Sequence, residues 1–280
     1  MRRWLFFLYG VTAHVIFFGV YAYMAGFVGN FLVPKSIDSV ARGPVSIAIL
    51  IDVLLLLLFA VQHSVMARPS FKRIWTRVVP EPIERSTYVM IANAVVVLLM
   101  WQWRGIDRVV WDAEQPIFRA VLWGLFVVGW LLVPVASLLI NHFDLFGTRQ
   151  VWLHLRGRSY ESLPFRTPSL YKHVRHPLYV GWMIAFWATP TMTAGHLLFA
   201  VVMTGYMIVA VVFFEERNLI EYFGRQYEDY RRRVPMFVPR WKTMFVRQRE
   251  IDDVADRICA EQAGSDLYLL DVFPHHAQWK

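Results

Sequence analysis

The sequence predicts an all-α protein, a polytopic integral membrane bundle with about six membrane segments. Of its 280 residues, 57% are hydrophobic and only 18% are charged, and the mean hydropathy is +0.40. Long apolar runs recur along the chain, most of them near the ~20 residues that a helix needs to cross a bilayer. Lys and Arg gather in alternate connections between these runs, as the positive-inside rule requires of a membrane protein.

The apolar runs predict the segments in order. They are expected at residues 4–33, 44–66, 88–103, 117–140, 174–190 and 197–214. The first begins like a signal peptide, but its apolar run is much too long for one. The fifth is the shortest, because its uninterrupted part, residues 178–189, covers only ~18 Å as a helix against ~30 Å of hydrocarbon. Either Arg175 and His176 lie at membrane depth or this segment is re-entrant.

Charge predicts the orientation of the bundle. Under the six-segment scheme, 24 of the 29 Lys and Arg residues fall on one side. The positive-inside rule makes this the cytoplasmic side, so both termini are expected in the cytoplasm. The net charge of +8 then reflects topology, and no nucleic-acid partner is expected, because the basic residues do not share one amphipathic face. The single cysteine, Cys259, allows neither a disulfide nor a Cys-based metal cluster within the chain.

Two polar segments on the cytoplasmic side contain the candidate binding groups. Arg175 and His176 precede Pro177, a residue that keeps its predecessor extended and readily starts a helix. Glu215 and Glu216 stand where the sixth segment leaves the membrane. Adjacent carboxylates at that depth are costly unless they are paired or bind a cation. The apolar hairpin between the segments returns the chain to the same side, so we expect the two segments to meet around a positively charged ligand.

These segments resemble the C-terminal half of the isoprenylcysteine carboxyl methyltransferase and phospholipid methyltransferase superfamily, over about residues 160–240. The matching residues are Tyr171, Arg175, His176, Pro177, Tyr179, Gly181, Glu215, Glu216, Tyr222, Phe223, Gly224, Tyr227, Tyr230, Arg233, Val234, Pro235 and Pro239. The resemblance implies S-adenosyl-L-methionine as the cofactor, bound in a cytoplasmic C-terminal region. The residues that it implies as cofactor contacts are Leu163, Pro164, Phe165, Arg166, Tyr171, His176, Tyr179 and Glu215.

A closer resemblance covers about residues 1–242. The stretches 62–66, 84–88, 141–147 and 193–200 are similar to those of bacterial methanethiol S-methyltransferases, which make dimethyl sulfide. This implies an enzyme of the bacterial inner membrane with a methyltransferase domain at 1–242, divided into helices one to four (1–158) and a cofactor-binding part (159–242). A cytoplasmic tail, 243–280, follows. Methanethiol and membrane lipids are the implied partners, with no metal and no protein partner implied.

Methyl transfer to a thiol needs a base, because an alkyl thiol is largely protonated at neutral pH. His142 and Asp144 are expected to supply the base and its orienting carboxylate. In a continuous helix they point about 200° apart, so they converge only if the helix ends near Asn141. Aromatic residues are expected to face the sulfonium and exclude water; these are Phe143, Phe146, Trp152 and Phe165.

Other functions remain open at this point. The nearest is methylation of a prenylcysteine carboxylate or a phospholipid, and another is a haem-binding or assembly membrane protein without methyltransferase activity. His14 and His63 lie at different depths under the predicted topology, which argues against a haem axial pair. His14 is expected to be a packing or interfacial residue. Asp52 and His63, nearly three turns apart on one helix face, are expected to pair within the bundle.

Overall fold

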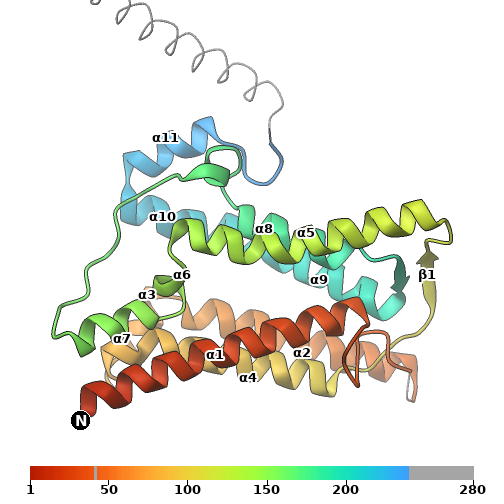
Figure 1. Cartoon of the computed structure of the whole chain (residues 1–280), viewed down its shortest axis with the longest axis horizontal. Helices are drawn as coiled ribbons and strands as arrows, with labels where there is room; N and C mark the ends of the chain where they lie inside the picture. Colours follow the sequence, from red (N-terminus) through yellow and green to blue (C-terminus); the bar gives the residue numbers. More distant parts are fainter. Residues whose placement is uncertain (41–42, 240–280) are drawn as a thin grey trace, which may run out of the picture. The chain divides into compact units, whose positions relative to one another are not determined.

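The computed structural model describes residues 1–40 and 43–239. The chain divides into two units, Met1–Phe237 and Val238–Lys280, and the fold that follows is that of the first. It is a helical bundle (Figure 1), which confirms the predicted all-α class. The predicted tail at 243–280 and its boundary at residue 242 lie outside the described residues.

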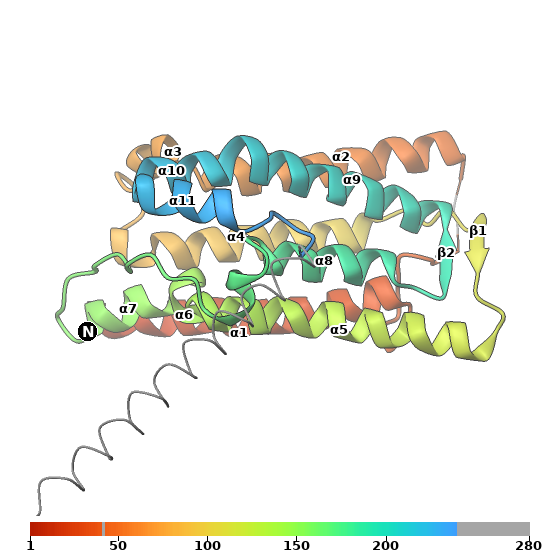
Figure 2. The same cartoon turned by 90° about the horizontal axis from the view of Figure 1, so that it is seen from above.

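The main helices of this unit form two layers (Figures 1 and 2). In one layer α4 (Glu81–Gln102) lies between α1 (Arg2–Gly29) and α2 (Val45–Met66). In the other, α8 (Pro177–Trp187) lies between α5 (Pro116–Ile140) and α9 (Ala194–Ala210). Contacts between α2 and α9 join the layers.

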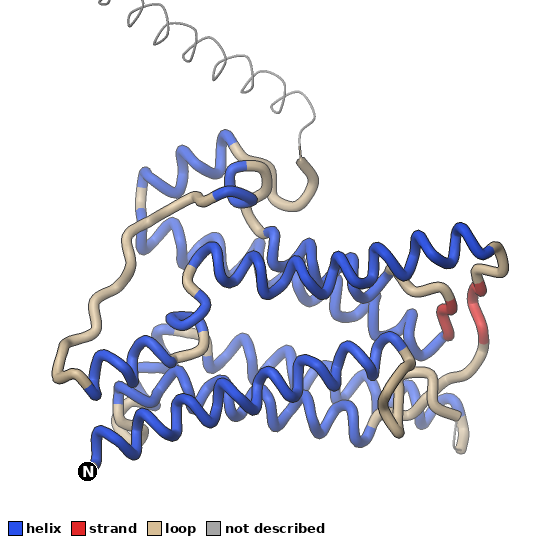
Figure 3. The backbone as a smooth tube through the Cα atoms, in the orientation of Figure 1, coloured by secondary structure: helices blue, strands red, loops and turns tan. Residues whose placement is uncertain are grey.

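Shorter elements complete the unit. Several short helices lie toward the end of the bundle where the chain begins (Figure 2). They are α3 (Pro69–Trp75), α6 (His142–Leu145), α7 (Thr148–Leu155), the 3₁₀ turn η1 (Ser169–Lys172), α10 (Glu216–Phe223) and α11 (Arg225–Arg233). At the other end, strands β1 (Val109–Asp112) and β2 (Thr191–Thr193) pair antiparallel (Figure 3).

Within residues 1–40 and 43–239, five helices are long and apolar enough to cross a membrane: α1, α2, α4, α5 and the continuous run Ala194–Phe223. The chain is therefore a multi-pass membrane protein. The fifth predicted segment is the short one, as expected. Its helix, α8, has 11 residues and a length of ~16 Å, and extended chain then continues to β2. The fifth segment is therefore part helix, in α8, and part extended chain, which leads to β2 at the end of the bundle where α5 begins.

Helix α8 packs closely on α5 through two glycines. A Cβ atom on Gly129 would lie 2.5 Å from the backbone nitrogen of Ala185, and one on Gly181 would lie 3.0 Å from the carbonyl oxygen of Gly129. Small residues let membrane helices approach this closely. The glycine pair therefore fixes the depth at which α8, and with it His176, sits against α5.

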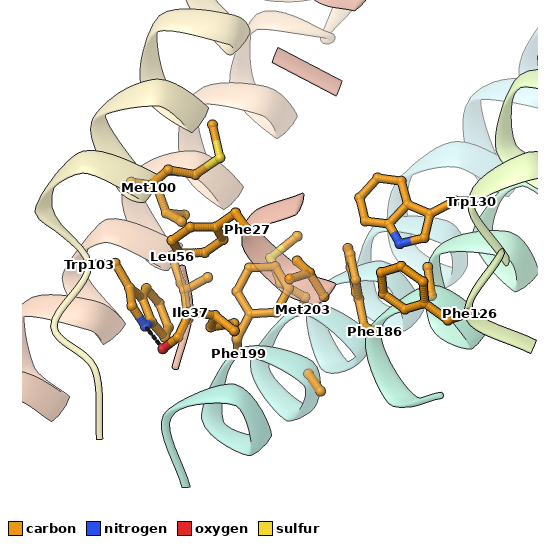
Figure 4. Packing of buried hydrophobic residues seen from close by; sticks show 14 of the residues in the cluster. Phe27, Ile37, Leu56, Met100, Trp103, Phe126, Trp130, Phe186, Phe199 and Met203 are labelled. Carbon is orange, nitrogen blue, oxygen red and sulfur yellow. Dashed lines mark hydrogen bonds between the residues drawn. The ribbon is translucent and has the colours of Figure 1, made fainter. Parts of the chain in front are cut away.

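One apolar core joins both layers (Figure 4). Its buried members come from both layers, that is from α1, α2, α4, α5, α8 and α9 and the residues beside them. They include Phe27, Leu56, Trp103, Phe126, Phe186 and Phe199. The indole nitrogen of Trp103 donates a hydrogen bond to the carbonyl of Ile37 at 3.1 Å. Bulky aromatic rings thus close the interior at the end near β1.

The predicted pairing of Asp52 with His63 is wrong. Asp52 is fully buried and accepts a hydrogen bond from the backbone N–H of Arg104 at 2.8 Å. His63 instead contacts the hydroxyl of Tyr88, with its Nδ1 at 2.9 Å. Sharing one helix face did not bring the two side chains together, because eleven residues of helix hold them ~16 Å apart. Tyr88 of α4 and Arg104, which follows α4, are the nearer partners.

Candidate active site

A π-helical turn places the two glutamates. Helix α9 ends at Ala210, and residues Val211–Glu215 form the π turn η2 before α10 begins at Glu216. Such a turn inserts an extra residue into the helical repeat and is frequent at functional sites. Neighbouring carboxylates can then serve different partners, which is what the structure shows.

Glu216 is a structural residue. Its side chain is 7% exposed and its Oε1 lies 2.6 Å from Nη2 of Arg175, whose side chain is 8% exposed. The Nη1 atom of Arg175 also donates to the carbonyls of Arg231 and Val234, at 3.0 and 2.5 Å. The pair therefore fastens α10 and the end of α11 to the segment before α8.

Glu215 is the accessible carboxylate. Its side chain is 39% exposed, and its Oε2 accepts a hydrogen bond from the hydroxyl of Tyr179 at 2.6 Å. His176 lies between the two glutamates, with Nδ1 3.6 Å from Glu215 Oε1 and Nε2 3.2 Å from Glu216 Oε1. Burial would lower the pKa of His176, but the hydrogen bonds and charges of both carboxylates outweigh it and raise that pKa.

Tyr171 connects this cluster to α5. Its hydroxyl donates to the carbonyl of Ala136 at 3.3 Å, and its own carbonyl accepts a hydrogen bond from Tyr230 at 2.6 Å. Burial, with a contribution from the charge of Glu215, raises the pKa of Tyr171. Tyr171, His176, Tyr179 and Glu215 are therefore brought together, as the sequence predicts for cofactor contacts.

The segment from Leu163 to Arg166 reaches the cluster through one residue. Phe165 packs on Phe223, Tyr227 and Tyr230, with ring centroids 5.2 to 5.9 Å apart. Leu163 is half-buried, whereas Pro164 and Arg166 are exposed. Phe165 is thus linked to Tyr171 through Tyr230, whose hydroxyl donates to the carbonyl of Tyr171.

The cluster suits a cationic ligand that carries an aromatic ring. Glu215 offers a half-exposed carboxylate, which favours a positive charge, and the rings of Tyr179 and Phe237 lie beside His176, with centroids 5.8 and 6.1 Å from it. A carboxylate beside aromatic rings is the kind of arrangement that could hold S-adenosyl-L-methionine, the cofactor that the resemblance implies.

His142 and Asp144 have separate partners. Helix α5 does end at Ile140, with Asn141 as its C-cap, but α6 begins at once, so the two side chains still diverge. His142 is buried, and its Nδ1 lies 2.7 Å from Ser137 Oγ and its Nε2 2.8 Å from Nε2 of His14. Burial lowers the pKa of His142.

Asp144 binds the chain that follows it. Its carboxylate lies 2.9 Å from Nη1 of Arg149 and accepts a hydrogen bond from the hydroxyl of Tyr160 at 3.2 Å. Burial and this carboxylate raise the pKa of Tyr160. Among the described residues, then, the expected contact between His142 and Asp144 is replaced by two independent networks.

The predicted aromatic residues also divide between sites. Phe143 and Phe146 pack on His142, with centroids 5.8 and 4.6 Å away. Trp152 packs instead on Phe7, 5.7 Å away. Phe165 packs on Phe223, Tyr227 and Tyr230, as described above. Of the four predicted aromatic residues, Phe143 and Phe146 are therefore the two that pack against His142.

Sequence reasoning missed His14. The residue was assigned to packing, yet it contacts His142, 128 positions along the chain. A lone histidine in an apolar helix carries no periodic signal for such a contact. The run Asn141-His142-Phe143-Asp144 predicts a polar site at the end of an apolar helix, but it does not indicate a partner from another helix.

The fold and this cluster define a polytopic helical membrane protein with a polar side-chain cluster toward one end of its bundle. Residues 51–276 match the family model described as NnrU protein. The chain is 50% identical to the methanethiol S-methyltransferase of Mycobacterium tuberculosis over 239 residues, covering 85% of this chain and 98% of that protein. It is also 50% identical to methanethiol S-methyltransferase 2 of Bradyrhizobium diazoefficiens over 250 residues, covering 89% and 95% of the two chains.

The chain belongs to the NnrU family. The two bacterial relatives confirm the resemblance read from the sequence and make the chain a methyltransferase. A more distant similarity, 35% identity over 168 residues, links it to Nurim of Rattus norvegicus and covers 57% of this chain and 63% of that protein. No solved structure matches the chain.

Proposed function

We propose that this protein transfers a methyl group from S-adenosyl-L-methionine to methanethiol and releases dimethyl sulfide. The observation that carries the proposal is the match with relatives of that name, at 50% identity over 98% and 95% of their lengths. The meeting of Tyr179, His176 and Glu215 supports it, because these are the residues expected to bind the cofactor. By the distribution of Lys and Arg, we place the site on the cytoplasmic face of the bacterial inner membrane.

In this proposal the cofactor is held by the Glu215 cluster. When bound, it supplies an electrophilic methyl group on a sulfonium. Glu215 binds positive charge, Tyr179 and His176 fix the direction of its carboxylate, and Tyr171 ties the site to α5. The segment from Leu163 to Arg166 lies along the edge of the site. In-line transfer depends on such positioning and on exclusion of water.

His142 is the proposed base. It lies beside Ser137, the residue next to Ala136, whose carbonyl Tyr171 binds. His142 and Tyr171 thus contact consecutive residues, Ser137 and Ala136, near the end of α5. Asp144 has a different role from the one expected: through Arg149 and Tyr160 it holds α6, and therefore His142, in place.

The test is to incubate the purified protein with S-adenosyl-L-methionine and, separately, methanethiol, hydrogen sulfide, a prenylcysteine and phosphatidylethanolamine. We expect dimethyl sulfide in the headspace from methanethiol, and no methylated lipid or ester. Methylation of the prenylcysteine or the phospholipid alone would replace this function with that of the wider superfamily. A Soret band from stoichiometric haem, without methyl transfer, would replace it with a haem protein.

A further inference from the structure

Both ring nitrogens and the ring faces of His14 have close contacts. Its Nδ1 lies 2.8 Å from Thr148 Oγ1 and its Nε2 lies 2.8 Å from Nε2 of His142. The ring is stacked between Phe18 and Phe146, with centroids 5.0 and 5.1 Å away and interplanar angles of 17° and 7°. A ring fixed in its plane in this way directs its two nitrogens at fixed partners.

The line of hydrogen bonds continues beyond His142. Its other nitrogen, Nδ1, lies 2.7 Å from Ser137 Oγ, which is also 2.9 Å from the carbonyl oxygen of Pro134. Four groups from four helices therefore form one continuous line: Ser137 of α5, His142 of α6, His14 of α1 and Thr148 of α7.

The line has only two complete hydrogen-bonding patterns. A neutral imidazole has one N–H and one lone pair, and a hydroxyl has one proton to donate. Every contact within the line is satisfied when all protons point toward Thr148 and Ser137 donates to His142, or when all point toward Ser137, which then donates to Pro134. The two patterns differ by the passage of one proton along the line. Its geometry is therefore suited to moving a proton as well as to packing.

The charged residues near His14 and His142 have other partners. In the part of the chain that the structure describes, neither one hydrogen-bonds to a carboxylate. On α6 and α7 the charged Asp144 and Arg149 bind each other. On α4, Arg85 lies beside Gly147 and over the ring of Tyr88. The proton of a substrate would therefore be taken by the line itself and not by an imidazole–carboxylate pair.

The inner end of the line is next along the chain to the residue that Tyr171 contacts. Ser137 directly follows Ala136, the residue whose carbonyl accepts the hydrogen bond of Tyr171 at 3.3 Å. The outer end, Thr148, is half-buried at the first residue of α7. A proton entering at Ser137 would thus leave the buried interior at Thr148.

We propose that Ser137, His142, His14 and Thr148 form a proton relay for the methylation of the thiol, which presupposes the function proposed above. The thiol S–H bond breaks and its proton passes to Ser137 Oγ, while the proton of Ser137 moves to His142 Nδ1. The proton on His142 Nε2 moves to His14 Nε2, that on His14 Nδ1 moves to Thr148, and Thr148 releases its own proton to water. The thiolate sulfur bonds to the methyl group as the methyl–sulfonium bond breaks, and that electron pair stays on the cofactor sulfur.

Three variants of the full chain test the relay. His14→Gln keeps a polar side chain but cannot pass a proton between two ring nitrogens. Thr148→Val keeps the shape of the side chain and removes the outer hydroxyl. Tyr9→Phe is the matched control, because it removes another hydrogen bond between α1 and its neighbours, the one from Tyr9 to Thr87.

Rates of dimethyl sulfide formation are measured from about pH 6.5 to about pH 10, and rates of methylation with the more acidic 2,2,2-trifluoroethanethiol are measured beside them. At neutral pH we expect His14→Gln and Thr148→Val to lower kcat by about 100-fold, the range of general base catalysis, with cofactor affinity unchanged in calorimetry. The deficit should shrink at high pH and with the acidic thiol, because thiolate then forms without a base. Tyr9→Phe should match the unaltered protein throughout.

A deficit of the same size at every pH and with both thiols would overturn the relay, because it would show that these residues only support the fold. Unaltered rates in both variants would overturn it as well. If His14→Gln fails to bind the cofactor, the pH dependence of kcat in Thr148→Val alone decides whether the relay holds. If the unaltered protein makes no dimethyl sulfide, the proposed function itself fails, an outcome distinct from an active enzyme whose variants lack the pH-dependent deficit.

Discussion

Neutralising each of the adjacent glutamates in turn separates the structural carboxylate from the binding one. In Glu216→Gln, the guanidinium of Arg175 keeps its charge but loses the carboxylate that lies 2.6 Å away, with both side chains less than a tenth exposed. Breaking a buried ion pair costs ~3–5 kcal/mol. Because Gln retains one acceptor oxygen, we expect ~3 kcal/mol, or a fall in Tm of about 6–12 °C for a chain of this size.

Glu215→Gln should have the opposite profile. Its side chain is 39% exposed, so the change should cost the fold less than ~1 kcal/mol, as for an exposed pair. The loss of a charged hydrogen-bond partner should weaken cofactor binding by ~1.5–3 kcal/mol, which is about 10- to 150-fold in Kd. Thermal unfolding in detergent and calorimetric titration with S-adenosyl-L-methionine measure the two effects. Equal losses of stability in the two variants, or normal cofactor affinity in Glu215→Gln, would refute this division of roles.

Three further outcomes are expected. The pKa of His176 is raised above its ordinary 6.5, so the residue stabilises the fold fully below pH 6.5 and loses that contribution as pH rises through the raised pKa. Between pH 6.5 and about pH 9, Tm should therefore fall more in the unaltered protein than in His176→Gln. Parallel curves of Tm against pH would contradict this. Asp144→Ala should lower turnover with cofactor affinity intact, because α6 loses its anchor to Arg149; unchanged turnover in the headspace assay would remove Asp144 from the mechanism. Gly181→Val should lower Tm by overpacking against Gly129, at ~1–3 kcal/mol or more, whereas Gly205→Val, at a glycine with open space around it, should not.

Sequence reasoning located the apolar helices well. The predicted segments at 44–66 and 117–140 match α2 (Val45–Met66) and α5 (Pro116–Ile140) within one residue, because their apolar runs and helices coincide. The third helix was placed too late, at residue 88. Its first turns carry Glu81, Glu84 and Arg85, and hydropathy excludes such residues even where a proline at the start favours a helix.

The sixth apolar segment ends at residue 214, where hydropathy falls, and the helical run continues through the π turn and α10 to Phe223. A π turn has no sequence signature that separates it from an ordinary helix. The sequence therefore predicts neither the turn nor the different exposure of Glu215 and Glu216.

The candidate site was predicted where a motif is local and missed where it is assembled from distant helices. Tyr171, His176 and Tyr179 lie within nine residues, and one hairpin brings Glu215 to them. The partner of His142 comes instead from α1, and its identity depends on how the two layers of the bundle pack. For the same reason, Asp144 was paired with the wrong neighbour: spacing along the chain cannot show that Arg149 and Tyr160 reach it first.

The most direct test of the central claim is the fate of a labelled methyl group. The purified protein is incubated with S-adenosyl-L-methionine carrying a deuterated methyl and with unlabelled methanethiol, and the headspace is analysed by mass spectrometry. Dimethyl sulfide with one deuterated and one ordinary methyl group is the predicted product, and Glu215→Gln should form it more slowly at limiting cofactor. Unlabelled dimethyl sulfide, or none at all from protein that binds the cofactor, would contradict the account.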